Sequence, residues 1–107
     1  MKKVLLVLLL SFVLCGCGKS ELDKIIEEDD YIIVDVRTEA EYNEGHVVGS
    51  INVPHDRIES GNFDKDKTVI VYCKSGGRSK IAYDTLTKLG YDVYDLGALD
   101  SINLPKE

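Results

Sequence analysis

Two almost wholly apolar runs constrain the fold of this chain more than any other feature. They cover residues 31–36 and 68–72, are rich in β-branched side chains, and contain Asp35 as their only charged residue. A strand with one face in water alternates polar and apolar residues, whereas a continuous run is typical of a strand buried on both faces. The chain is therefore expected to build a parallel sheet with helices on its faces.

The segments around these runs carry helix signals. Ser20 can cap a first helix, which places Leu22 and Ile25 on one side. Thr38 and Glu41 have the spacing of a capping box. The helices that these signals predict cover residues 20–28, 38–45, 55–60 and 79–89.

Two shorter strands complete the pattern. Residues 50–53 form a brief strand that Pro54 ends, and residues 92–96 follow the last helix. Alternating strands and helices imply right-handed crossovers within one small α/β domain. We expect a central parallel sheet of four to five strands flanked by helices, and little regular structure in residues 98–107.

The first residues do not belong to this domain. Lys2 and Lys3 precede an apolar run over residues 4–14, broken only by Ser11, which is shorter than the roughly 20 residues that span a bilayer. Such a run fits the apolar part of a secretory signal. The following segment, Leu14-Cys15-Gly16-Cys17, resembles the lipobox of bacterial lipoproteins, in which cleavage falls just before a lipid-bearing cysteine.

The small Gly16 before Cys17 favours Cys17 over Cys15 as the lipidation site. An uncleaved anchor or plain secretion is the alternative. We expect residues 1–16 to be removed as a signal peptide, residues 17–19 to serve as lipid anchor and tether, and residues 20–107 to form the domain. The chain would then lie outside the cytoplasm, held to a bacterial membrane by its lipid.

The charge of the chain limits its partners. The formal net charge is −6, and removal of Lys2 and Lys3 makes it −8. Nucleic acid is an unsuitable partner, because binding it requires Lys and Arg that neutralise phosphates. Attachment to anionic lipid would likewise depend on acyl chains and not on a basic patch. The domain itself is expected to be a monomer.

Cys73 is the residue with the strongest chemical signal. Of the three cysteines, Cys15 is expected to leave with the leader and Cys17 to become a thioether, so that Cys73 would be the one thiol that remains free. It follows the second apolar run directly, and ligands of open α/β sheets bind beyond the carboxyl ends of strands. A buried, inert cysteine is the alternative.

The loop after Cys73 favours a reactive thiolate. Gly76 and Gly77 allow successive N–H groups to turn inward, and the helix that begins near Ser79 adds its own unpaired N–H groups. Lys74 and Arg78 contribute two positive charges. This setting is expected to lower the thiol pKa below about 8.5 and to hold an anionic substrate over the sulfur.

Several motifs in a fixed order resemble a single-domain rhodanese. They are Asp35-Val36-Arg37, Glu41-Tyr42, Gly45-His46, the segment 49–54, and Cys73-Lys74-Ser75-Gly76-Gly77-Arg78-Ser79. The resemblance covers about residues 20–97. It implies a sulfurtransferase that needs no metal or organic cofactor and carries sulfur from a small anionic donor such as thiosulfate to cyanide or a thiol through a cysteine persulfide.

The resemblance also implies roles for individual residues. Cys73 matches the catalytic nucleophile, and Lys74, Ser75, Gly76, Gly77, Arg78 and Ser79 match the loop that binds substrate and persulfide. Asp35 and Arg37 match a supporting ion pair that could border the same pocket. His46 is assigned a packing role and His55 a place at the surface.

Two other functions remain open from the sequence. Related phosphatases and arsenate reductases use a Cys-x5-Arg loop, whereas Cys73 and Arg78 enclose four residues, which gives a smaller cradle suited to attack on sulfur. A non-catalytic rhodanese-type binding module is the second alternative, although such modules often lack the cysteine.

Overall fold

The computed structural model describes residues 20–107. The signal peptide predicted for residues 1–16, the lipidation site at Cys17 and the tether at residues 17–19 lie outside the described residues. Within residues 20–107, no helix is long and apolar enough to cross a membrane.

A four-stranded parallel sheet forms the centre of the domain, which confirms the predicted α/β class. Its strands are β1 (Tyr31–Asp35), β2 (Ile51–Asn52), β3 (Thr68–Cys73) and β4 (Asp92–Ala98), in the order β2-β1-β3-β4. All three pairings are parallel. Every residue of β3 is buried, as its uninterrupted apolar sequence predicts for an inner strand.

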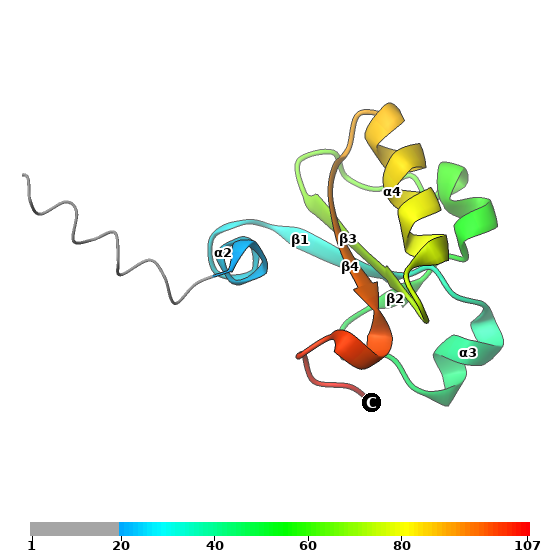
Figure 1. Cartoon of the computed structure of the whole chain (residues 1–107). Coiled ribbons are helices and arrows are strands. Elements are labelled where there is room, and N and C mark those ends of the chain that lie inside the picture. The colour runs from blue at the N-terminus through cyan, green and yellow to red at the C-terminus, as the bar shows by residue number, and fades with distance from the viewer. Residues whose placement is uncertain (1–19) are drawn as a thin grey trace, which may run out of the picture.

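The two faces of the sheet carry separate hydrophobic cores. On one face, Val69, Val71 and Cys73 of β3 pack with Ala82 and Leu86 of α4 (Gly77–Lys88). The 3-10 helix η1 (His55–Ser60) lies beside α4 on this face (Figure 1). Because side chains alternate along a strand, the intervening residues of β3 point to the other face.

The second core lies under α2 (Glu21–Glu28). Ile70 and Tyr72 of β3 pack there with Ile25 of α2 and with Ile102 near the end of the chain. Figure 1 shows α2 on the side of the sheet away from α4. The sheet is thus covered on both faces, although each cover is a single layer of short helices.

The predicted helix caps are present. Ser20 caps α2 in a capping box with Asp23. Thr38 and Glu41 form the predicted capping box at the start of α3 (Glu39–Glu44), and Gly45 ends that helix. Element ends differ by a few residues from the predictions: β2 is two residues long, α4 begins at Gly77, and β4 extends to Ala98.

The prediction of little regular structure in residues 98–107 agrees with the secondary structure but misses how the segment packs on the domain. Leu99–Ser101 form a 3-10 turn, η2, and Ile102 is buried in the second core. Glu107 and His46 exchange two backbone hydrogen bonds of 2.9 and 2.8 Å. The segment is ordered by contacts with residues far away in the sequence, which local patterns do not report.

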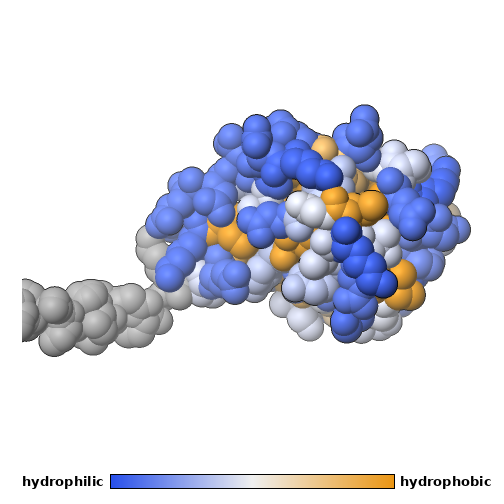
Figure 2. Space-filling model, turned by 90° about the horizontal axis from the view of Figure 1, so that it is seen from above, coloured by the Kyte–Doolittle hydropathy of each residue, from blue (hydrophilic) through white to orange (hydrophobic). Residues whose placement is uncertain are grey.

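The surface is mainly hydrophilic on the face that Figure 2 shows, with small, separate hydrophobic areas. This agrees with a composition in which charged residues make up 30% of the chain. The exposed large hydrophobic residues lie on different elements, among them Ile51 on β2 and Ile81 on α4.

Candidate active site

Cys73 is the last residue of β3 and lies at the carboxyl end of the sheet. Its side chain points to the face covered by α4 and is fully buried. It is the free cysteine of residues 20–107. The sequence prediction that Cys73 stands at the end of an inner strand is therefore confirmed.

The loop after β3 turns its N–H groups onto the sulfur. The Gly76 N–H donates to Cys73 Sγ over 3.0 Å, and the Ser79 N–H donates over 3.3 Å. Gly76 has a φ of 102°, a conformation that favours glycine, and it is the N-cap of α4. Ser79 Oγ donates to the Gly76 carbonyl over 3.1 Å and so braces the turn.

These contacts favour the thiolate form. Burial raises the pKa of the Cys73 thiol, but hydrogen bonds from the Ser79 side chain and from the Ser79, Gly76 and Ser75 N–H groups outweigh it, so the pKa lies below the ordinary thiol value. The predicted direction is confirmed. Hydrogen bonds are the main cause of the lowered pKa. The sequence had predicted a contribution from the positive charges of Lys74 and Arg78 as well as from the N–H groups.

The two cations of the loop lie in different settings. Lys74 is exposed. Arg78, in the first turn of α4, donates from both terminal nitrogens to the Glu41 carboxylate over 2.8 and 3.1 Å. Ser75 and Gly77 of the same loop are exposed.

Glu41 is a site residue that the sequence interpretation assigned only to the cap of α3. Its carboxylate accepts from Thr38 in the capping box and from Arg78 across the loop. The Arg78 guanidinium, followed by the Thr38 N–H, lowers the pKa of Glu41 to about 2. The two residues of this ion pair are 37 positions apart in the sequence, so a local spacing rule could not find the pair.

Asp35 and Arg37 form a buried ion pair, as predicted. Arg37 donates from Nε to both Asp35 oxygens, over 2.9 and 3.0 Å, and from a terminal nitrogen to the Gly45 carbonyl over 2.6 Å. The Asp35 carboxylate raises the pKa of Arg37. The pair lies against Tyr72, on the face away from Cys73, so it braces the end of α3 and does not border the sulfur.

The family model for the rhodanese-like domain matches residues 19–100. The chain belongs to the rhodanese-like family.

Named relatives within the rhodanese-like family support sulfur transfer as the general reaction of this chain. The chain is 40% identical over 78 residues to the thiosulfate sulfurtransferase PspE of Escherichia coli, covering 68% of this chain and 75% of that relative. It is 33% identical over 76 residues to a sulfurtransferase of Allochromatium vinosum, covering 69% and 71% of the two chains.

A solved rhodanese from E. coli, determined with anions, has the same architecture. It superimposes with a TM-score of 0.67 at 35% sequence identity, covering 72% of this chain and 96% of that one. The central parallel sheet and its flanking helices are therefore those of the rhodanese-like family.

His46 packs in the way that the rhodanese resemblance implies. Its ring stacks on Tyr42 with centroids 3.8 Å apart, and its Nδ1 lies 2.8 Å from the Tyr42 carbonyl oxygen. Its Nε2 lies 3.3 Å from the Glu107 carboxylate. The other histidine, His55, starts η1 and is half-buried, so its predicted surface position is only partly right.

The described part of the chain holds no group of three or more His, Cys, Asp or Glu side chains that could ligate a metal ion.

Proposed function

We propose that this domain is a thiosulfate-type sulfurtransferase in which Cys73 carries sulfur as a persulfide. The observation that carries the proposal is the convergence of two backbone N–H groups on Cys73 Sγ. Donors fixed around a sulfur stabilise negative charge on it, both in the thiolate that attacks and in the persulfide that forms.

The first half of the reaction moves one sulfur atom onto Cys73. The thiolate attacks the outer sulfur of thiosulfate, a Cys73 S–S bond forms, and the S–S bond of thiosulfate breaks. Sulfite leaves with the electron pair. Cys73 then bears a persulfide whose outer sulfur lies within the loop of residues 74–79.

The second half returns the enzyme to its starting state. A nucleophile such as cyanide or a thiol attacks the outer sulfur of the persulfide. The electron pair of the broken bond passes to Cys73 Sγ, which becomes a thiolate again. Thiocyanate or a new persulfide is released, so the cycle is a double displacement that needs no bound cofactor.

The loop residues divide the work of binding. Lys74, exposed beside the sulfur, attracts the dianionic donor in an otherwise acidic chain. The N–H groups of Gly76 and Ser79 donate to the sulfur, and in this proposal those of Ser75 and Gly77 bind the group attached to it. Arg78 is held by Glu41 in an ion pair. In this proposal Arg78 therefore fixes the start of α4, and its positive charge acts on the substrate without direct contact.

The burial of Cys73 requires the loop to move during turnover. The sulfur is covered at rest, and thiosulfate must reach its outer side. Ser75 and Gly77 are exposed, and a Cβ added at Gly76 or Gly77 would meet no residue beyond its immediate neighbours within 4 Å. In this proposal the exposed part of the loop, residues 74–77, shifts outward, while Ser79 stays buried and Arg78 stays paired with Glu41.

A phosphatase is the less favoured alternative. Phosphoryl transfer requires cationic donors aimed at the phosphoryl oxygens. Both terminal nitrogens of Arg78 are bound to Glu41, and the loop is one residue shorter than Cys-x5-Arg. A purely binding module is also less favoured, because the nucleophile and its N–H donors are all present.

The test is a mass measurement on the purified protein. Incubation with thiosulfate should add the mass of one sulfur atom at Cys73, and cyanide should remove it and release thiocyanate. Cys73→Ser should abolish both steps. Lys74→Ala should reduce the rate of persulfide formation by roughly threefold to tenfold, because one partly screened positive charge that attracts thiosulfate is lost. Hydrolysis of an aryl phosphate without any persulfide would contradict the proposal.

We further propose that the domain acts outside the cytoplasm, attached to a bacterial membrane through a lipid on Cys17. The support is the short apolar run followed by Leu14-Cys15-Gly16-Cys17. Its partners in this proposal are the small anionic donor, the thiol or cyanide acceptor and the membrane. The acidic charge argues against nucleic acid, and the domain acts as a monomer.

A further inference from the structure

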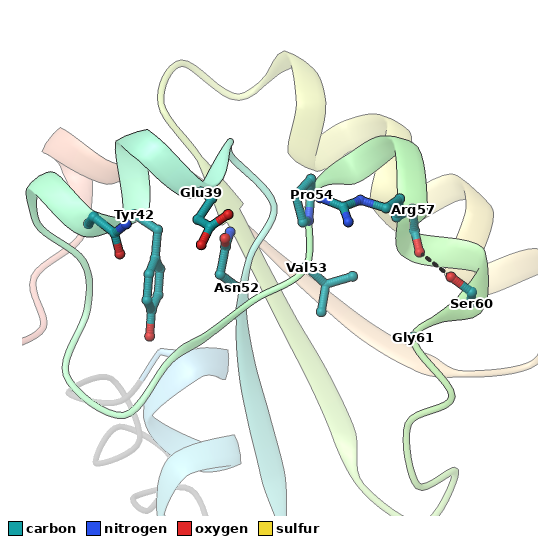
Figure 3. A pocket seen from close by; sticks show the side chains of 9 residues that line it. Glu39, Tyr42, Asn52, Val53, Pro54, Arg57, Ser60 and Gly61 are labelled. Atoms are coloured by element: carbon teal, nitrogen blue, oxygen red, sulfur yellow. Dashed lines mark hydrogen bonds between the residues drawn. The ribbon is translucent and has the colours of Figure 1, made fainter.

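A cavity of about 550 Å³ lies outside the Cys73 loop, whose residues do not line it. It opens between α3 and η1, beyond the carboxyl end of β2 (Figure 3). Its volume is in the range of sites for small molecules. The residues that matter to its chemistry are Glu39, Tyr42, Asn52, Val53, Pro54 and Arg57.

The cavity is closely connected to the sulfur site. Only β1 lies between β2 and β3 in the sheet, so the ends of β2 and β3 are about 10 Å apart, or two strand spacings. Val53 lines the cavity and also packs on the hydrophobic core that contains Cys73. The wall formed by α3 is tied to the Cys73 loop through the Glu41–Arg78 ion pair.

Two opposite charges face each other across this cavity. Glu39 comes from α3 and Arg57 from η1; both are exposed, and neither side chain has an ion pair or hydrogen bond among residues 20–107. Figure 3 shows Glu39 beside Asn52, and the Arg57 side chain extending from η1 toward Pro54. The cavity therefore offers an anionic and a cationic subsite without a strong net charge.

The floor between these charges is fixed. The Asn52 side-chain nitrogen donates to the carbonyls of Asp35 and Arg37, each over 3.0 Å. This leaves the Asn52 carbonyl oxygen free to accept from a ligand. On the α3 side, the Tyr42 hydroxyl donates to the Ser50 carbonyl over 2.6 Å and holds the ring in place.

We propose that this cavity binds the sulfur acceptor, and that the acceptor is a small zwitterionic thiol of the dipeptide type. Its ammonium would lie at Glu39 and Asn52, and its carboxylate at Arg57. A dipeptide spans about 7 Å between its two charged ends, and in this proposal its side-chain thiol reaches from the cavity toward Cys73. This assignment rests on the proposed persulfide chemistry.

The transfer itself balances without a further reagent. The acceptor thiol passes its proton to the outer sulfur of the Cys73 persulfide, and the resulting thiolate attacks that sulfur and forms a new S–S bond. The Cys73 S–S bond breaks, and its electron pair leaves Cys73 as the thiolate. The acceptor departs as a hydropersulfide that keeps the proton.

The first experiment compares acceptors on protein whose Cys73 has been loaded from thiosulfate. The rate of sulfur loss is measured with cysteinylglycine and with 2-mercaptoethanol, which has no charge to place in the cavity. The ratio of the two rates is then compared between proteins, which cancels the intrinsic reactivity of each thiol. Glu39→Gln and Arg57→Gln should each lower this ratio about twofold to fivefold, as expected for an exposed ion pair.

Glu59→Gln is the matched control, because Glu59 also lies on η1 but does not line the cavity. It should leave the ratio unchanged. Equal ratios in the wild type, Glu39→Gln and Arg57→Gln would overturn the acceptor assignment while leaving the persulfide proposal intact. Failure to load sulfur at all would instead overturn the persulfide proposal.

The second experiment does not depend on sulfur chemistry. Alanylglycine, which has the same charged ends but no thiol, is titrated into the protein and followed by amide chemical shifts. Saturable shifts at Asn52 and Arg57, reduced in Glu39→Gln, are expected. No shift at these positions at any concentration would overturn the proposed binding site.

Discussion

At the scale of single residues, neighbouring positions of β3 have opposite tasks. Tyr72 points into the core under α2, where its hydroxyl accepts the Val47 N–H over 3.0 Å and lies 3.3 Å from Ser50 Oγ. Cys73 points to the other face, at the start of the reactive loop. The alternation of a strand thus separates a fixed structural contact from a reactive sulfur.

The lowered pKa of Cys73 predicts its reactivity toward an alkylating agent. The rate of reaction with iodoacetamide, plotted against pH, should show an inflection below about 8.5, the value of an unperturbed thiol. The same pKa shift affects stability, because the folded protein loses this proton more easily than the unfolded chain. The Cys73 thiolate therefore stabilises the folded state fully above the unfolded pKa, and this stabilisation is lost as pH falls through the folded pKa. An inflection at or above 8.5 would indicate an inert, buried thiol.

Gly76 and Gly77 provide a matched pair of substitutions. Gly76→Ala should lower the free energy of unfolding by about 1–2 kcal/mol, because φ at this position is 102°. Gly77 is the first residue of α4, has no positive φ and has open space around it. Gly77→Ala should therefore be neutral or stabilise by about 0.5 kcal/mol. Urea unfolding measures both, and equal losses would contradict this account of the turn.

At the scale of elements, one residue of α3, Glu41, links the start of its own helix to the start of α4. The Glu41 carboxylate accepts from the Thr38 N–H and hydroxyl at the start of α3 and from Arg78 at the start of α4. The Cys73 loop is therefore held at its far end by a helix that follows a different strand.

Glu41→Gln isolates the ion pair, since glutamine can still complete a capping box. The free energy of unfolding at neutral pH should fall by about 0.5–1 kcal/mol, the range for partly exposed pairs. Glu41 has a pKa of about 2 in the folded state, so this stabilisation should be full above about 4.3. It should then be lost as pH falls toward 2.

Glu44→Gln is the control, because Glu44 lies on the same helix, is exposed and makes no contact with Arg78. Its effect should be small at every pH. An equal loss for both variants would show that the charge of α3 as a whole, and not the pair with Arg78, is responsible.

Elements with strong local signals were predictable, and contacts between them were not. The apolar runs identified β1 and β3, and the helices α2 and α3 begin where the capping residues Ser20 and Thr38 predict. Cys73 and its loop could be identified because they are contiguous. The Glu41–Arg78 pair and the side of the sheet that Arg37 occupies depend on tertiary packing, so no short pattern reveals them.

At the scale of the whole molecule, the end of the chain completes one face of the sheet. Ile102 fills the core under α2, and Leu99 and Leu104 pack around it. Lys106 forms an antiparallel bridge with Val47. Isolated hydrophobic residues between Asp100 and Glu107 gave no periodic signal, yet the thin second core needs them.

The proposed anchor makes a prediction for the intact protein. Expressed in bacteria, the wild type should incorporate labelled palmitate and fractionate with membranes, because two or more acyl chains hold a protein stably at a bilayer. Cys17→Ser should remain unprocessed and unlabelled. Cys15→Ser is the control and should be labelled normally; loss of label only in that variant would move the site to Cys15.

The burial of Cys73 also has a consequence for its chemical lifetime. Thiolates of low pKa are the cysteines most easily oxidised by peroxide, through sulfenic acid to forms that cannot be recovered. Here the sulfur is fully buried beneath its own loop. If the loop must shift to admit a sulfur donor, as proposed above, the same loop also shields the nucleophile from peroxide whenever no donor is bound.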